Sequence, residues 1–148
     1  MKATIRILVI LFLTIILSSG WDMRPDDFFI STIYTVAGII FSVGLSLIVT
    51  FSLHGIKNKS YITRIRKNLY DIRFSFIGNF IIATIAYIFN NYIGSAFYTR
   101  TVLNIEIKFA FSILFSLMIF YAIAYFIVNM LAIQKLNNDL LDKINEEC

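Results

Sequence analysis

The feature that most constrains the fold is an uninterrupted run of 26 uncharged residues, from Phe28 to Leu53. A helix needs about 20 mainly apolar residues to cross the ~30 Å hydrocarbon core of a bilayer. The run therefore predicts a membrane-spanning helix. The composition agrees, because 59% of the residues are hydrophobic and only 15% are charged, whereas a soluble domain has about 25% charged residues.

Three further apolar segments predict an all-α integral membrane bundle with about four transmembrane helices. We expect a membrane domain over residues 1–133, with spans at about 4–21, 28–53, 74–92 and 109–130. Residues 134–148 are expected to form a cytoplasmic tail with a short helix. The first segment has two interpretations, because Lys2 and Arg6 precede a short apolar core that ends in small residues. It is either a cleaved signal peptide or an uncleaved first span, and we favour the uncleaved span.

A basic segment separates the second and third predicted spans. Only one acid, Asp71, accompanies its six basic residues, which are Lys57, Lys59, Arg64, Arg66, Lys67 and Arg73. Apolar residues recur at helical spacing from Ile62 to Phe76, which predicts a basic amphipathic helix leading into the third span. Such a helix would rest on an anionic inner leaflet, or it would bind an acidic protein or nucleic acid.

The distribution of basic residues predicts the orientation of the chain. Ten of the 13 lysines and arginines fall within residues 1–6, 54–73 and 134–148. Cytoplasmic segments of membrane proteins carry an excess of Lys and Arg. We therefore predict a multi-pass protein of the bacterial inner membrane with both termini in the cytoplasm. Residues 21–27 form an external loop in this prediction, and residues 93–108 form an external turn region.

Two patterns inside the spans are candidate functional positions. Gly38, Ser42 and Ser46 are four residues apart, and such small residues allow close approach of another helix. They would pack within one protomer or form the seam of a homo-oligomer. Asn79 and Asn90 are about three helical turns apart, so they share a face. They would form hydrogen bonds between helices or line a polar path.

No pattern in the sequence predicts catalysis. There is one histidine, His54, and one cysteine, Cys148, so the sequence contains no Cys/His metal cluster. It contains no glycine-rich phosphate loop either. Asp and Glu are absent from the middle of every predicted span, which argues against proton-coupled transport. We therefore expect no enzyme activity and no cofactor.

The segment Tyr34–Phe80 has a distinctive layout, a span with small residues, then a basic stretch, then a second span. It reads YTVAGIIFSVGLSLIVTFSLHGIKNKSYITRIRKNLYDIRFSFIGNF. This layout resembles that of the small membrane effectors of bacterial anti-phage systems, including a retron-associated effector and the effectors of nucleotide-signalling defence. Those effectors commonly have two spans, so four would be a departure, and no functional residue carries over.

The resemblance implies a function that depends on a trigger. In those families a cytoplasmic partner keeps the membrane protein silent until phage is sensed, and the effector then damages the inner membrane. By that resemblance, the chain would form a homo-oligomer in the lipid bilayer and permeabilise it. Its control would come from a cytoplasmic regulatory protein or protein–nucleic acid complex. The alternatives are a non-lytic binding, immunity or sensor subunit and a phage holin.

Overall fold

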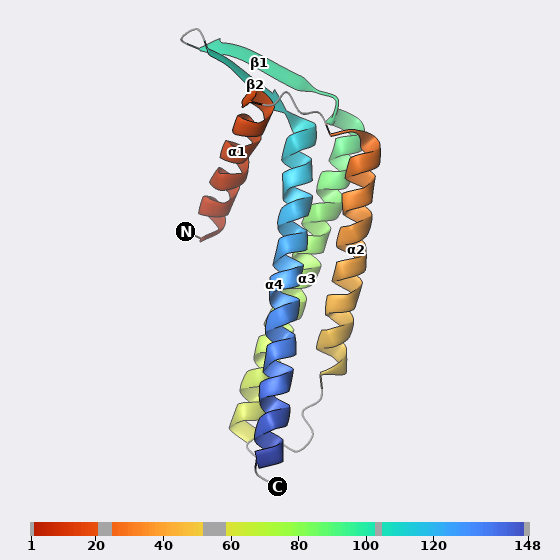
Figure 1. The fold of residues 1–148 in the computed structure, drawn as a ribbon, viewed down its shortest axis with the longest axis vertical. Helices are drawn as coiled ribbons and strands as arrows, with labels where there is room; N and C mark the ends of the chain where they lie inside the picture. Colours follow the sequence, from red (N-terminus) through yellow and green to blue (C-terminus); the bar gives the residue numbers. More distant parts are fainter. Residues whose placement is uncertain (1, 21–24, 52–58, 103–104, 147–148) are drawn as a thin grey trace.

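The computed structural model describes residues 2–20, 25–51, 59–102 and 105–146. The elements follow in the order α1 (Lys2–Gly20), α2 (Asp27–Thr50), α3 (Lys59–Ile93), β1 (Phe97–Val102), β2 (Ile105–Ala110) and α4 (Phe111–Glu146). The helices α2, α3 and α4 form an elongated bundle, and α1 lies beside the half of α4 that is nearer the hairpin (Figure 1). The chain is mainly helical, as predicted, with one small β-hairpin.

Three of the described helices are long and apolar enough to cross a membrane. These are α2, α3 and the Phe111–Leu140 part of α4. The corresponding apolar stretch of α1, Thr4–Gly20, is shorter. The prediction of a helical membrane protein is therefore supported by three helices, and the fourth predicted span is not confirmed.

Buried residues repeat every seven positions along two of the long helices. In α3 these are Leu69, Phe76, Ala83 and Asn90, and in α4 they are Ile119, Phe126, Ile133 and Leu140. Residues seven apart stay on one side of a helix that packs along its whole length at a small crossing angle. The core of the protein therefore runs along the axis of the bundle.

Aromatic rings fill the space between α2 and α3. The ring centroids of Phe41 and Phe80 are 4.3 Å apart, and the two rings are stacked. The buried Gly44 faces Phe76, whose ring would overlap a Cβ placed on that glycine. The two helices therefore approach each other closely at Gly44.

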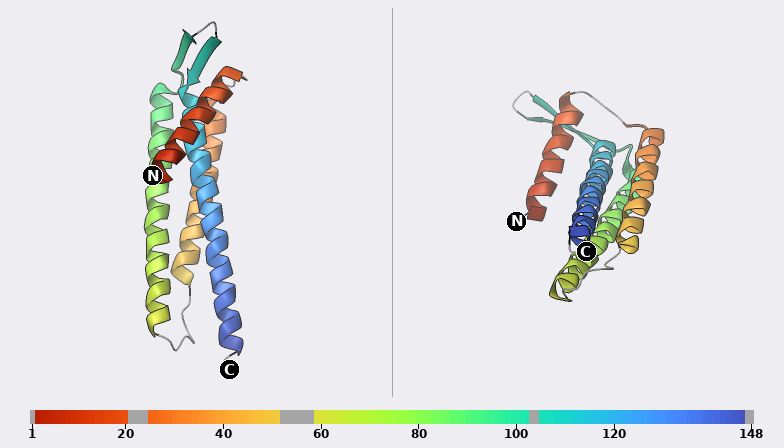
Figure 2. Two further views of the ribbon diagram at one scale, coloured as in Figure 1. Left: turned by 90° about the vertical axis from the view of Figure 1, so that its left-hand side faces the viewer. Right: turned by 60° about the horizontal axis from the view of Figure 1, so that its bottom comes forward.

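Both α3 and α4 extend beyond the predicted spans. Residues 59–73 form the first part of α3, and residues 134–146 continue α4 without a break. Ile65 and Leu69 belong to the same buried cluster as Ile133 and Leu140. The apolar side of the basic segment is thus buried within the chain, and both α3 and α4 extend past the end of α2 (Figure 2). The basic segment leads into the third span as one helix, and its predicted place on the inner leaflet is not confirmed.

The region predicted as a turn contains an antiparallel hairpin, in which Phe97 pairs with Ala110 and Val102 with Ile105. Its strands read FYTRTV and IEIKFA, and such β-branched and aromatic residues are typical of strands. The end of α1 covers one edge of β2. The hydroxyl of Ser18 accepts a hydrogen bond from the backbone N–H of Ala110 at 3.1 Å, and Ser19 accepts one from Lys108 at 3.0 Å. These bonds satisfy donors that an open strand edge would expose.

Candidate functional site

The helix α1 is fixed to the rest of the protein near both of its ends. Ser18 holds its C-terminal end to β2, and at the other end Arg6 Nη1 donates a hydrogen bond to the Tyr121 hydroxyl at 2.7 Å. Thr14 and Ser18 are buried, while large apolar side chains such as Phe12 are exposed. Small polar residues are the usual contacts between helices in lipid. The helix therefore turns its small polar side toward the protein and its apolar side outward.

The two contacts fix the level of Arg6 along the bundle. Tyr121 lies about 15 Å along α4 from Phe111, at 1.5 Å per residue. That distance is half of a ~30 Å hydrocarbon core. The guanidinium of Arg6 is therefore held beside the middle of the apolar part of α4, which differs from the cytoplasmic position predicted for residues 1–6.

A cavity of about 360 Å³ lies between α1, α3 and α4 beside this contact. Its lining is mostly apolar, and the polar side chains that reach it are Arg6, Asn79 and Tyr121. The amide of Asn79 donates to the backbone carbonyl of Ser75 at 2.8 Å, within its own helix. Asn79 thus combines a local hydrogen bond with a position on the wall of this cavity, which is open to the outside of the bundle.

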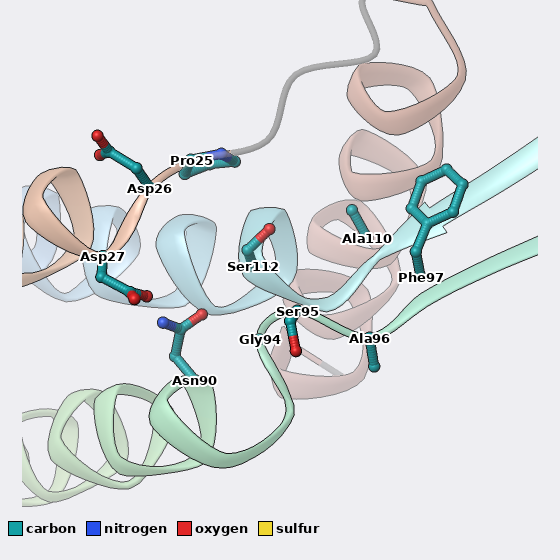
Figure 3. A pocket seen from close by; sticks show the side chains of 10 residues that line it. All are labelled: Pro25, Asp26, Asp27, Asn90, Gly94, Ser95, Ala96, Phe97, Ala110 and Ser112. Carbon is teal, nitrogen blue, oxygen red and sulfur yellow. The ribbon is translucent and has the colours of Figure 1, made fainter.

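The second predicted asparagine lies at the end of the bundle. Asn90 is 4% exposed and lines a separate cavity between the ends of α2, α3 and α4 (Figure 3). Asn79 and Asn90 lie on the side of α3 that packs inside the chain, as their spacing indicates. Asn79 and Asn90 line two different cavities among those formed by described residues, and the polar path predicted between protomers stays a prediction.

The predicted stripe of small residues lies mainly on the outside of the chain. Ser42 and Ser46 are exposed, and Gly38 is partly buried. A Cβ added to Gly38 would lie 3.9 Å from a ring carbon of Phe80. The Ser42 hydroxyl donates to the Gly38 carbonyl at 2.9 Å, so its hydrogen bond is made within α2. Close packing inside one protomer therefore involves Gly44 rather than these serines. The seam between protomers stays a prediction.

The basic residues of α3 point away from the core. The exposed members are Lys59, Arg64, Arg66, Lys67 and Arg73, and Lys57 lies outside the described residues. Their exposure leaves these five side chains open to lipid headgroups or to a partner. Among the described residues, no group of three or more His, Cys, Asp or Glu side chains is placed to hold a metal ion.

Comparison of the chain with protein families, curated proteins and solved structures finds no match. A functional argument must therefore start from the residues themselves. The sequence predicts Arg6 as a cytoplasmic charge or as the positive start of a signal peptide, and Ser18 as one of the small residues after the apolar core. It gave Thr14 no role. Two small polar residues four apart on an otherwise apolar helix would have indicated its packing side.

Proposed function

We propose that this protein is a self-associating protein of the bacterial inner membrane that perturbs or permeabilises the bilayer. It would act as a defence effector under the control of a cytoplasmic partner. The observation that carries this proposal is the level of Arg6, which contacts Tyr121 beside the middle of the apolar part of α4. A charged side chain near the bilayer centre is costly, and the membrane responds by local thinning and entry of water.

The surroundings of Arg6 support this role. Exposed apolar side chains cover the rest of α1, among them Leu8 and Phe12. The described residues that line the neighbouring cavity include no carboxylate that would neutralise the guanidinium. Water and lipid phosphates would then become its partners. In this way, α1 would place a charged group and its bound water among the lipid chains, which is a polar defect in the bilayer.

Self-association would concentrate these defects. The stripe of Gly38, Ser42 and Ser46 supports it, because Ser42 and Ser46 are exposed on a helix that is long and apolar enough to span a membrane. Small residues on such a surface permit close contact with a second copy of the helix. Each added copy would then bring another α1 into the same region of bilayer, on the side of α4 away from α2 (Figure 1).

Ion leakage from liposomes that contain the purified protein tests the perturbation. The variant Arg6→Gln should leak several-fold more slowly than the parent protein. Arg100→Gln is the matched control, because it removes the same charge from an exposed position on β1. Equal leakage in the two variants would contradict the role of Arg6. The proposed function is contradicted if liposomes that contain the parent protein do not leak ions and its expression does not depolarise cells.

Crosslinking in membranes tests the seam independently. Replacing Ser42 and Ser46 together by Ile should lower the oligomer fraction, because larger side chains keep the helices apart. Val43→Ile is the control at an exposed position elsewhere on α2. An unchanged oligomer fraction in the double variant would mean that the protomers contact each other through another surface.

A second candidate function is a non-lytic subunit that recruits a cytoplasmic partner. It is favoured by the ends of α3 and α4 that extend past α2, since the end of α3 carries exposed Arg64, Arg66 and Lys67. Replacing these three residues by Gln separates the two functions. A recruiting subunit would lose its partner without any change in leakage, whereas a regulated effector would also lose the control of its leakage.

A further inference from the structure

The cavity of about 360 Å³ beside Arg6 has the size and the lining of a small-molecule site. Ligand pockets have volumes of about 300–1,000 Å³, with mainly apolar walls and a few polar groups that orient the ligand. Here Ile10, Ile82 and Met118 supply apolar wall from three different helices. The cavity is open to the outside of the bundle, so a ligand can enter it from the surrounding lipid.

The polar groups of this lining are hydrogen-bond donors with unused capacity. The Tyr121 hydroxyl accepts a hydrogen bond from Arg6 Nη1 at 2.7 Å, so its own proton remains to be donated. The Asn79 amide donates one N–H to the Ser75 carbonyl at 2.8 Å, and its second N–H remains. Asn79 and Tyr121 are half-buried and Arg6 is exposed, so a ligand can reach all three side chains.

The charge of the lining selects the sign of the ligand. Arg6 is the charged side chain among the described residues that line the cavity, and no carboxylate accompanies it there. A guanidinium has five N–H donors, and it binds a carboxylate through two parallel hydrogen bonds. The lining therefore attracts an anion that accepts hydrogen bonds, and it repels a cation.

The depth of the site selects an anion with an apolar chain. Arg6 lies at the level of Tyr121, beside the middle of the apolar part of α4. A phospholipid carries its charge in the headgroup, so its phosphate reaches this level only if the bilayer thins. A fatty acid carries one carboxyl group at the end of its chain. Burial favours the neutral form of a carboxylic acid, so the acid can enter the hydrocarbon and lose its proton to water beside Arg6.

We propose that this cavity binds the carboxylate of a long-chain fatty acid. Arg6 would hold the two carboxylate oxygens, while the Tyr121 hydroxyl and the Asn79 amide would donate further hydrogen bonds to them. The chain would lie along the apolar wall and leave through the opening into the lipid. Because the three donors belong to α1, α3 and α4, the ligand would also connect α1 to the bundle.

Photocrosslinking with palmitate that carries a diazirine tests this site, with the full chain in nanodiscs of zwitterionic lipid. The crosslinks should map to residues 7–10 and 118–122, and unlabelled palmitate should compete with saturation. Hexadecanol has the same chain without the carboxylate, so it should compete about tenfold more weakly. Anionic phospholipid added to the nanodiscs should leave the crosslinking unchanged.

Two pairs of variants test the residues. Arg6→Gln should weaken palmitate binding about tenfold, because the charged donor is lost, whereas Arg100→Gln on β1 should retain the parent affinity. Ile82→Trp fills the cavity without changing the polar groups, so it should abolish the crosslinks. Its matched control is Ile88→Trp, at an isoleucine of α3 that is similarly exposed but lies outside the lining.

The proposal is overturned if hexadecanol competes as well as palmitate, if Arg6→Gln and Arg100→Gln bind equally, or if anionic phospholipid displaces the probe. The fatty-acid site rests on the same position of Arg6 as the proposed function, but binding is measured without leakage. Saturable crosslinking in a protein that does not leak would contradict the proposed function alone. Leakage without saturable crosslinking would contradict the fatty-acid site alone.

Discussion

The guanidinium of Arg6 donates a hydrogen bond to the hydroxyl of Tyr121, 115 positions away in the sequence, at 2.7 Å. The same guanidinium carbon lies 5.9 Å from the centre of the Tyr121 ring. Both interactions depend on the level at which α1 lies beside α4. The position of the Arg6 charge along the bundle therefore depends on how α1, whose outer surface is apolar, packs against α4.

Replacement of Tyr121 by Phe should loosen α1 without disturbing the three-helix core. The ring remains, but the acceptor for Arg6 is lost, and a hydrogen bond to a charged group contributes about 1.5–3 kcal/mol. Hydrogen exchange should accelerate in α1 and remain unchanged in α2. The control is Tyr92→Phe, since Tyr92 is 80% exposed at the end of α3. Equal exchange rates in the two variants would show that the hydroxyl does not hold α1.

Replacement of Ser18 by Ala should detach the other end of α1. Ser18 is 1% exposed, so water cannot easily replace its hydroxyl beside the Ala110 N–H. A buried donor left without a partner costs about 1–3 kcal/mol. Ser19→Ala should have a smaller effect, because Ser19 is exposed and water can bond Lys108 instead. We expect the Ala110 amide to exchange faster in Ser18→Ala and not in Ser19→Ala. Faster exchange of this amide in Ser19→Ala than in Ser18→Ala would contradict the prediction.

The glycines of α2 should respond differently to an added methyl group. Gly44→Ala forces its Cβ into the buried ring of Phe76, and overpacking of a core costs about 1–3 kcal/mol. Gly38→Ala meets Phe80 only at 3.9 Å, which is ordinary contact. We expect a lower Tm in detergent for Gly44→Ala, little change for Gly38→Ala, and partial recovery in Gly44→Ala with Phe76→Leu. Equal Tm values for the two single variants would contradict the close approach at Gly44.

Replacement of Arg64, Arg66 and Lys67 by Gln should leave the fold intact, because all three side chains are exposed. Surface substitutions usually change stability by less than about 0.5 kcal/mol each. The parent protein should be stabilised by anionic lipid more than by zwitterionic lipid, and salt should weaken this difference. The triple variant should lose most of the difference, as measured by Tm in nanodiscs. A difference that persists in full would mean that these residues do not face the headgroups.

Much of the helical structure could be predicted from the sequence. The uncharged run from Phe28 to Leu53 corresponds closely to α2, and the repeats of apolar residues in α3 and α4 determine which sides are buried. The hairpin was missed because its strands are six residues each, too short to stand out between long apolar helices. Its alternating Thr, Tyr and Ile residues still carried a recognisable signal.

Hydropathy and helical periodicity are local properties, so the residues alone predict helices apolar enough to cross a membrane, the length of α2 and the shared side of Asn79 and Asn90. Packing between elements brings Arg6 to Tyr121, Ser18 to the edge of β2, and Asn90 to the same cavity as Asp27. Each of these pairs joins different elements. Such contacts depend on how the helices and the hairpin pack together, which no local pattern along the chain specifies.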